Sequence, residues 1–328
     1  MTEVKRHVVT AEEAGMRLDR WFKVHFPQVT FAYLNKLTRT GQVRIGAGRC
    51  KTNTRIEADQ EIRVPPLAFD TRPADTPKAD VKPLTPQERR LFDSMVIHED
   101  RDLFVLNKPS GFAVQGGTKT HQHLDGLLMG LGVELGERPL LVHRLDRDTS
   151  GLIVIARRRS VAAALGKLFA TRAVKKTYWA IVKGVPQPAQ GRIEVALIKA
   201  KGPDGDRMRA SQEGEEEDEQ RAVTHYAVIG KAGSACAWVS LKPVTGRQHQ
   251  LRAHMAHIGT PIMGDEKYGG LDDMPEGMAR KLHLHARRIV FPHPREGVID
   301  ISAPLPEHML TSFELFGFDP NRFAEDHA

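Results

Sequence analysis

The sequence predicts an α+β protein made of a small basic N-terminal domain and a larger domain with a mixed, largely antiparallel sheet. Three observations lead to this prediction. A proline-rich segment divides the chain near residues 65–86. Beyond it, short apolar segments of strand length alternate with segments of helical periodicity. Most connections between them are too short for parallel crossovers, so neighbouring strands should mostly run antiparallel, with helices packed against the sheet.

The composition is that of a globular protein with no membrane segment. The chain has 328 residues, of which 40% are hydrophobic and 27% charged. No apolar run approaches the roughly 20 residues that span a bilayer, and the start, MTEVKRHVVTAEEAG, lacks the apolar core of a signal peptide. The two cysteines, Cys50 and Cys236, have neither metal-site nor redox-motif spacing. We therefore expect a cytoplasmic protein with reduced thiols.

The charge distribution points to a polyanionic partner for the N-terminal domain. The formal net charge is +7, and residues 1–65 hold 12 Lys and Arg against 7 Asp and Glu. Most of the excess charge therefore lies in the first fifth of the chain. Clustered basic residues are typical of nucleic-acid-binding proteins. Scattered Lys and Arg are also the ordinary surface of a helix, so composition alone leaves a solvated face as the alternative.

The first 65 residues predict two helices followed by short strands. Leu18, Trp21 and Phe22 recur at helical spacing in AEEAGMRLDRWFKVHFP. Thr30 is expected to cap a second helix that begins at Phe31. GQVRIG and DQEIRVP then predict short strands.

This segment resembles the small RNA-binding fold named after the fourth protein of the small ribosomal subunit. The residues that carry the resemblance are RLDRWF (17–22), LNKLTRTGQVRI (34–45) and DQEIRVP (59–65). It implies an RNA-binding face on the second helix and the loop that follows. The RNA-binding residues expected from it are Arg17, Arg39, Gln42 and Arg44.

The proline-rich segment predicts a linker. PPLAFDTRPADTPKADVKPLTP holds six of the chain's 20 prolines and has almost no apolar periodicity. We accordingly predict an RNA-binding domain at 1–65, a linker at 66–90 and a second domain at 91–328.

The larger domain is predicted as a series of strands with three intervening helices. The segment VAAALGKLFATR predicts a helix, because Val161, Leu165 and Phe169 fall on one face. Ser160, directly before it, is expected to be its N-cap. The acidic run EGEEEDE (213–219) predicts a solvated loop directed away from any phosphate. In chain order the elements are strands at VIHED and LFVLNKPSG, a helix at LDGLLMGLGVEL, a strand at LIVIA, the helix VAAALGKLFATR, strands at KKTYWAIVKG, THYAVIG and ACAWVSLKPVTGR, a helix at QLRAHMAHIG, and strands at HARRIVFPHP and VIDIS.

The stretch VHRLDRDTSG (142–151) admits several chemical interpretations. Its two acids, Asp146 and Asp148, could be turn-formers that accept backbone hydrogen bonds. They could form the Asp-x-Asp-x-Thr loop of haloacid-dehalogenase-like phosphotransferases, but Thr149 follows Asp148 directly and the strand comes after the acids. Ser150 could be a hydrolase nucleophile, but the Gly-x-Ser-x-Gly elbow is absent.

The same stretch resembles the His-Arg-Leu-Asp-x-x-Thr-Ser-Gly signature of the RluA-like pseudouridine synthases. Further matches follow in the family's order: NKPSG, KKTYWAIVKG, TGRQHQLRAH, GTPIMGDEKYG and LHARRIVFPHP. The resemblance implies the pseudouridine synthase fold and an isomerase that converts uridine to pseudouridine in RNA, without a cofactor or metal. The target base must leave the helical stack to be reached.

The resemblance also assigns roles to individual residues. Asp146 is the catalytic acid, which either attacks the sugar carbon or removes a proton from the neighbouring ribose carbon. Arg144 fills the space that the flipped base vacates. Tyr178 stacks on that base and is also the candidate to remove the C5 proton, although a tyrosine is a poor base at neutral pH. Arg247 is expected to be the ion-pair partner that keeps Asp146 charged, while Asp148 is a turn residue.

Three clustered histidines raise the possibility of a metal. His249, His254 and His257 could bind zinc, but carboxylate or thiolate ligands are not nearby in the sequence. We expect no metal, and histidines that brace the Arg247 loop.

Within the family, VVTAEEAGMRLDRWF and VPPL most resemble the C-type branch that modifies large-subunit ribosomal RNA. The expected partner is therefore large-subunit ribosomal RNA, bound by a monomer away from membranes. The D-type branch and a catalytically silent RNA-binding or ribosome-assembly factor are the alternatives, and a silent factor need retain none of Asp146, Tyr178 and Arg247.

Overall fold

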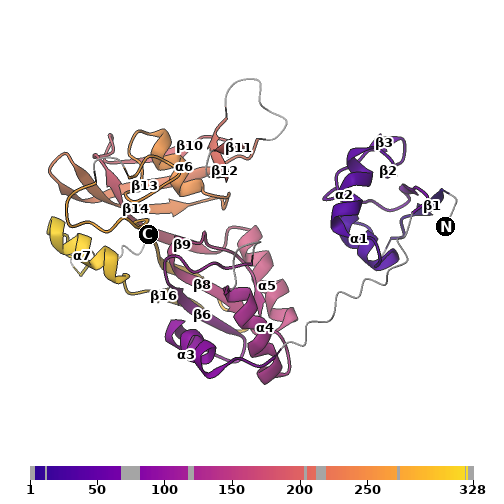
Figure 1. Cartoon of the computed structure of the whole chain (residues 1–328), viewed down its shortest axis with the longest axis horizontal. Helices are drawn as coiled ribbons and strands as arrows, with labels where there is room; N and C mark the ends of the chain where they lie inside the picture. The colour runs from indigo at the N-terminus through magenta and orange to yellow at the C-terminus, as the bar shows by residue number, and fades with distance from the viewer. Residues whose placement is uncertain are drawn as a thin grey trace. The chain divides into compact units, whose positions relative to one another are not determined.

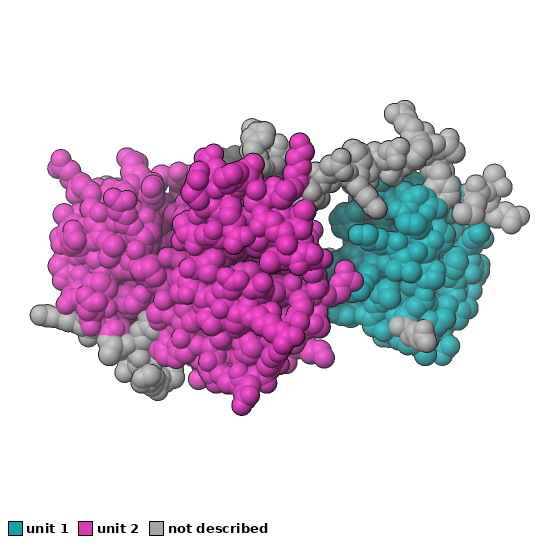
Figure 2. Space-filling view, turned by 90° about the horizontal axis from the view of Figure 1, so that it is seen from below, with its two compact units in different colours: residues 1–80 teal, residues 81–328 magenta. Residues whose placement is uncertain are grey.

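The computed structural model describes residues 4–11, 13–67, 82–116, 122–202, 205–211, 219–271, 274–321 and 323. The chain divides into two compact units, residues 1–80 and 81–328, coloured teal and magenta in Figure 2.

Unit 1 is a small sheet with two helices (Figure 1). The antiparallel strand order is β1-β4-β2-β3. The Thr30 hydroxyl accepts a hydrogen bond from the Tyr33 N–H at 3.2 Å, which confirms Thr30 as the cap of the second helix. Leu18 and Trp21 of the first helix are buried in the core of the unit with Leu34 of the second. Its elements are β1 (Lys5–Val8), α1 (Leu18–His25), α2 (Phe31–Arg39), β2 (Arg44–Ile45), β3 (Gly48–Arg49) and β4 (Glu61–Val64).

Unit 2 is built on one large mixed sheet. The strand order is β10-β13-β14-β9-β15-β8-β6-β5, with β16 beside β15 and β7 beside β8. Among the described strands only β8 and β15 pair in parallel, so the predicted α+β class with a largely antiparallel sheet is confirmed. A separate hairpin is formed by β11 and β12.

The strands of unit 2 are β5 (Val96–Glu99), β6 (Leu103–Lys108), β7 (Leu140–Leu141), β8 (Ser150–Ala156), β9 (Lys175–Lys183), β10 (Gln190–Glu194), β11 (Leu197–Gly202), β12 (Gly205–Ala210), β13 (Val223–Ala232), β14 (Cys236–Pro243), β15 (Leu284–Pro292) and β16 (Val298–Ser302). Its helices are α3 (Pro86–Met95), α4 (Leu124–Leu135), α5 (Arg159–Ala170), α6 (Gln250–His257) and α7 (Glu307–Phe316).

The central strand β9 separates two hydrophobic cores. Tyr178 and Ala180 face a core that includes residues of α6, whereas Trp179 and Ile181 face a core that includes residues of α7. Successive side chains of a strand point to opposite faces of a sheet. The two faces of β9 therefore present different surroundings, and only one of them carries Tyr178.

The predicted linker extends too far at its C-terminal end. Residues 86–90, assigned to the linker, form the first turn of α3. Thr85 and Glu88 make a reciprocal capping box, and Pro86 occupies the start of the helix, where its missing N–H costs nothing. Pro86, which was counted among the prolines of the linker, is therefore the first residue of α3.

The predicted cap at Ser160 is wrong. Helix α5 begins at Arg159, and Arg158 is its N-cap without a side-chain hydrogen bond to the helix. The Arg158 guanidinium instead pairs with Asp102. The N–H of Arg159 donates to the Glu137 carboxylate at 3.1 Å. A carboxylate from another segment thus satisfies the helix start two residues before the position that the serine suggested.

Three other expectations concern the acidic run, the membrane and the thiols. Residues 213–218 of the acidic run lie outside the described residues. In the described part of the chain, we find no helix with the length and apolarity needed for a membrane span. Cys50 and Cys236 are both buried free thiols.

Gly151 fixes the start of β8 against β15. Its φ is +104°, and a Cβ at this position would lie 2.3 Å from the Ala286 carbonyl oxygen. The parallel register pairs Gly151 with Ala286 and Ser150 with His285. Glycine is therefore required where the turn that carries Asp146 enters the sheet.

We predict that Gly151→Ala destabilises the protein by roughly 2–4 kcal/mol, because it combines a left-handed backbone with a backbone clash. Urea unfolding would measure the change. Gly166→Ala is the matched control, because no atom lies within 4 Å of its added Cβ in α5. That control should gain roughly 0.5–1 kcal/mol of helix stability. Equal stabilities for the two variants would contradict this account of Gly151.

Candidate active site

A cavity of about 500 Å³ brings the predicted catalytic residues together. It is lined by Arg144 and Asp146 from the turn before β8, Tyr178 from β9, and Arg247 from the segment before α6. His249 and Arg252, which the sequence analysis gave no catalytic role, line it as well. Residues more than 100 positions apart in the chain thus share one polar, partly open site.

The turn that carries Asp146 rests on a buried lysine. Lys108 is fully buried, and its ammonium donates hydrogen bonds of 2.9 Å to the carbonyl oxygens of Pro109, Phe112 and Arg147. Burial lowers the pKa of Lys108 to about 7, against the opposing charges of Asp148 and Asp146. One of these bonds, to Arg147, holds the Asp146 turn, and the other two hold the segment after β6. All three are charge-assisted when the amine is protonated.

A histidine supports the other side of the turn. The His143 ring stacks on Phe169 with centroids 4.5 Å apart, and its Nε2 accepts a hydrogen bond from the Val154 N–H at 2.8 Å. Burial, with the charge of Lys176, lowers the pKa of His143 to about 3. The imidazole is consequently neutral at physiological pH and serves as a support rather than a proton donor.

Arg252 is the cation that faces Asp146. Its Nη1 lies 3.5 Å from Asp146 Oδ2, while Nε and Nη2 each donate a 2.7 Å hydrogen bond to the Asp265 carboxylate. The Arg252 and Asp265 side chains are 6% and 0% exposed. Burial lowers the pKa of Arg252, but the hydrogen bonds and charge of Asp265 and the charge of Asp146 outweigh it and raise that pKa. A permanent cation is thus fixed beside the carboxylate.

The expectation that Arg247 pairs with Asp146 is therefore wrong. Arg247 is exposed, and its Nε donates to the Arg221 carbonyl oxygen at 3.1 Å. No ion pair joins Arg247 to Asp146 in the described structure. The reason lies in α6, which begins at Gln250 and turns Arg252 inward. The signal available in the sequence was a charged residue on the inward face of that helix, which needs a buried acid as its partner.

We predict that Arg252→Gln costs roughly 3–5 kcal/mol of stability, because it leaves the buried Asp265 carboxylate without its cation. Arg247→Gln should change the stability by less than about 0.5 kcal/mol, as expected for an exposed side chain. Chemical unfolding of both variants at pH 7 measures the difference. Similar losses for the two arginines would contradict the assignment.

Tyr178 lines the cavity from β9 and packs against the core that includes residues of α6. Its backbone pairs with Leu241 of β14 and Ala286 of β15. Burial raises the pKa of the Tyr178 hydroxyl above its usual value, and the charge of Asp146 raises it further. The residue is therefore a poor base at neutral pH. What it can contribute is the face of its ring, on which a nucleobase can stack.

The neighbours of His249 favour one of its two neutral tautomers. The Met208 N–H donates to the Tyr268 hydroxyl oxygen at 2.8 Å, and that hydroxyl lies 3.1 Å from His249 Nδ1. The hydroxyl can donate or accept, whereas the Asp146 carboxylate near the other ring nitrogen only accepts. This favours a neutral ring in which Nδ1 accepts from Tyr268 and the ring hydrogen is on Nε2. That nitrogen lies 3.8 Å from Asp146 Oδ2. The hairpin β11–β12 is thus connected through Tyr268 and His249 to the Asp146 carboxylate.

The backbone of His249 supports a functional role for this arrangement. Its φ is +50°, a left-handed conformation that non-glycine residues rarely adopt. Burial lowers the pKa of His249 despite the opposing charge of Asp146. A neutral Nε2–H donor is therefore held in a strained conformation beside the carboxylate.

We predict that Tyr268→Phe leaves His249 in a mixture of both neutral tautomers, because Nδ1 loses its donor. The ¹⁵N chemical shifts of the ring nitrogens measure this directly. His254 is an internal control, since its nitrogens lie 2.9 Å from the Thr224 hydroxyl and 3.1 Å from the Val195 carbonyl oxygen, away from Tyr268. An unchanged His249 spectrum would refute the proposed effect of Tyr268 on the tautomer of His249.

The other histidines of the sequence have separate surroundings. Both ring nitrogens of buried His254 have hydrogen-bond partners, and His257 is exposed. Ser150, considered as a hydrolase nucleophile, is 1% exposed, and its hydroxyl lies 2.9 Å from His285 Nδ1. A serine so deeply buried cannot reach a substrate.

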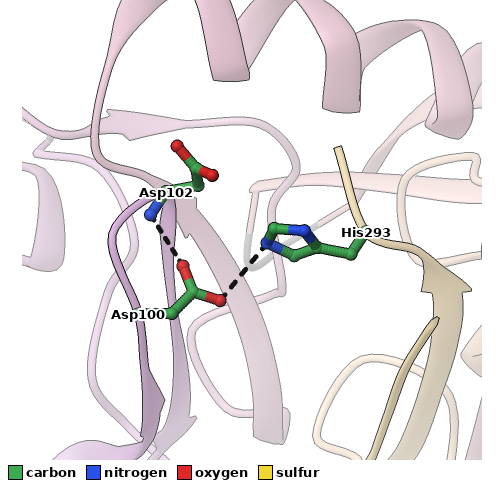
Figure 3. Close-up of side chains that lie close together, drawn as sticks. All are labelled: Asp100, Asp102 and His293. Atoms are coloured by element: carbon green, nitrogen blue, oxygen red, sulfur yellow. Dashed lines mark hydrogen bonds and ion pairs between the residues drawn. The ribbon is translucent and has the colours of Figure 1, made fainter. Parts of the chain in front are cut away.

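One group of the described residues, Asp100, Asp102 and His293, has metal-like geometry (Figure 3). Arg158 and Arg295 both pair with Asp102. The Asp100 carboxylate accepts the Asp102 N–H at 2.7 Å and lies 3.3 Å from His293 Nε2. These partners describe an ion-pair cluster that holds the turn between β5 and β6.

Three of the four RNA-binding residues predicted in unit 1 lie near the turn after α2, whereas Arg17 is the N-cap of α1. Arg39 and Gln42 are exposed there, and Arg44 Nε donates to the Gly41 carbonyl oxygen at 3.0 Å. Arg49, which the sequence analysis did not select, pairs with Arg44 across β2 and β3. Arg17 is engaged with Asp19, at 2.6 Å.

Comparison with known proteins identifies similar chains. The family model for RNA pseudouridylate synthase matches residues 102–257. The chain is 35% identical to the ribosomal large subunit pseudouridine synthase C of Escherichia coli over 93% of this chain and 94% of that protein. It is 32% identical to the RNA pseudouridine synthase 4, mitochondrial, of Arabidopsis thaliana, over 90% and 78%. Among solved structures, human RNA pseudouridylate synthase domain containing 4 has a TM-score of 0.59 and 30% identity, over 70% of this chain and 97% of that one.

Proposed function

Because this chain belongs to the RNA pseudouridylate synthase family, we propose that it isomerises specific uridines of large-subunit ribosomal RNA to pseudouridine. The observation that carries this proposal is the Asp146 carboxylate, which lies in a cavity of about 500 Å³ beside the fixed cation of Arg252. The reaction breaks the bond from uracil N1 to the ribose and joins the ribose to C5. The C5 proton is lost and N1 gains one, so the product is an isomer of the substrate.

Asp146 is suited to act on the ribose as a carboxylate. RNA that closes over the site would remove water, which raises the pKa of a carboxyl group. Arg252 opposes this effect, and Asp265 holds Arg252 in place. The electrostatic environment is therefore formed before the substrate arrives. Both routes remain compatible with this arrangement, attack on the sugar carbon and removal of a proton from its neighbour.

Arg144 and Tyr178 are suited to hold the substrate with its target base turned out. The Arg144 guanidinium is exposed at the cavity and makes no hydrogen bond or ion pair within the described chain. It can therefore enter the stack where the base has left, and its planar group can stack and bind phosphate. The Tyr178 ring offers a face for the flipped uracil.

Unit 1 is proposed to add affinity for RNA through phosphate contacts. Arg39, Gln42 and Arg44 surround the turn after α2, with Arg49 beside them. Arg17 is engaged with Asp19 and would contribute less. Phosphate contacts position an RNA, while the flipped base supplies the chemistry.

The C-type large-subunit enzyme is the proposed branch, and the D-type enzyme is less favoured. A chain that only bound RNA would have no need for Asp146 beside a buried Arg252–Asp265 pair. We further propose that the protein acts as a monomer in the cytoplasm, on ribosomal RNA, without a cofactor or metal.

We predict that Asp146→Asn abolishes pseudouridine formation while RNA binding persists, because the amide removes the charge and keeps the shape. Chemical mapping of pseudouridine in large-subunit RNA, from cells that carry only the variant, measures the outcome and identifies the target positions. Asp148→Asn, in the same turn, should retain activity. Pseudouridine made by the Asp146→Asn protein would refute the mechanism.

We also predict that the double variant Arg39→Gln/Arg44→Gln binds RNA more weakly and with a shallower salt dependence, by about 0.7–0.9 in slope for each phosphate that the variant no longer neutralises. Titration of the full chain at several salt concentrations measures both quantities. Lys23→Gln removes an exposed charge of unit 1 from α1 and is the control. If the double variant behaves like this control, unit 1 binds RNA by other residues.

A further inference from the structure

A row of basic residues crosses the large sheet on one face. Arg192 of β10 pairs in register with His225 of β13, and His225 pairs with Lys242 of β14. Two strands further, Arg288 of β15 pairs with Thr177 of β9. We call Arg192, His225, Lys242 and Arg288 the basic row. Residues directly opposite on neighbouring strands share a face of the sheet, so the first three side chains stand side by side.

The basic row lies on the face of the sheet opposite to the catalytic Tyr178. A hollow of about 560 Å³ is lined by the whole row together with Thr177 and Trp179. These two residues alternate along β9 with Tyr178, which lines the catalytic cavity. The row is therefore a separate surface and not a wall of the site described above.

A second hollow, of about 450 Å³, connects the two surfaces around the start of β9. It shares Arg172 and Lys176 with the catalytic cavity. It shares His225, Lys242 and Arg288 with the hollow on the far face. The concave surface is consequently continuous from Asp146 to the basic row.

The connecting hollow is strongly positive. Its lining includes a single acid, Asp300, which pairs with Arg288 at 2.6 Å. Lys242 and Lys175 are exposed and form no ion pair within the described chain. The cations of the lining are Arg172, Lys175, Lys176, Lys242 and Arg288.

Within the basic row, Lys242 is the cation best placed to receive a phosphate. Arg192 pairs with Glu194 at 2.5 Å, and Arg288 pairs with Asp300. The three cations of the row stand on alternate strands, with His225 between Arg192 and Lys242 and with β9 between Lys242 and Arg288. The two arginines have an anionic partner in the protein, whereas Lys242 has none among the described residues.

Arg172 occupies a backbone conformation that suits glycine better. It follows α5 with φ of +62°, at a position where helices usually end in glycine. Its side chain is exposed at the junction of the catalytic cavity and the connecting hollow. An arginine retained in a strained conformation at a cavity rim is consistent with a role in binding.

We propose that the RNA strand flanking the flipped nucleotide leaves the catalytic cavity past Arg172 and Lys175 and continues along the basic row on the far face of the sheet. The partner of this surface is the phosphate backbone, because the lining offers several cations. Of its aromatic rings, Trp179 and Tyr226 are buried and Phe323 packs against Trp238, so little ring surface is available for stacking bases. This inference rests on the proposed function, since it requires an RNA substrate in the catalytic cavity.

The first test compares two exposed strand lysines in the full chain. Lys242→Gln should raise the dissociation constant for substrate RNA several-fold and reduce the salt slope by about 0.7 to 0.9, the value for one phosphate contact. Lys231→Gln is the matched control, because it lies on β13 at the end away from His225. Fluorescence anisotropy with a labelled large-subunit RNA fragment measures both. Identical binding by the two variants would contradict the proposed path of the RNA strand along the basic row.

The second test separates binding from folding. Arg172→Gly should keep or raise the melting temperature, because glycine relieves the left-handed strain, and should still weaken RNA binding. A residue with only a structural role would not give this combination. Trimming the nucleotides that flank the target loop should abolish the difference between Arg172→Gly and the wild type.

The outcomes distinguish this inference from the proposed function. A wild-type protein that neither binds nor modifies large-subunit RNA would refute the proposed function itself. A wild-type protein that makes pseudouridine, with Lys242→Gln and Arg172→Gly binding as tightly as Lys231→Gln, would refute only the path along the basic row.

Discussion

The buried pair of Arg252 and Asp265 is the interaction on which the site depends. Two nitrogens of the guanidinium are held by Asp265, which leaves Nη1 directed at Asp146. A buried ion pair adds little net stability, because desolvation offsets the attraction. The pair instead positions Arg252, so that a permanent cation is held beside Asp146. Asp146 can then remain a carboxylate beneath an RNA that excludes water.

The support of Asp146 is divided among several elements, and each part uses a different kind of contact. Lys108 donates a hydrogen bond to the backbone of the turn, and Gly151 lets the turn enter the sheet without a backbone clash. The neutral ring of His249 lies beside the carboxylate. Lys108 and Gly151 lie outside the cavity lining, whereas His249 is part of it. Because they come from separate segments, removal of any one should disturb the geometry while leaving the rest of the sheet intact.

The two faces of the sheet have different roles. One face of β9 carries Tyr178 and the reacting groups, and the other carries the hollow with Trp179 and the basic row. The alternation of side chains along a strand makes this possible within consecutive residues. Chemistry and phosphate binding can therefore share one rigid element without competing for the same space.

Sequence alone determined the fold class, the capped helix at Thr30, and the identity of Asp146 and Tyr178 as cavity residues, because these depend on local periodicity and on a contiguous motif. It failed at Arg247, at Ser160 and at the end of the linker. In each case a contact accompanies the outcome: Arg252 with Asp265, the Arg159 N–H with Glu137, and the capping box of Thr85 and Glu88. The tautomer of His249 and the basic row likewise depend on residues brought together from distant strands. Such proximity is set by strand register and packing, which no local pattern encodes.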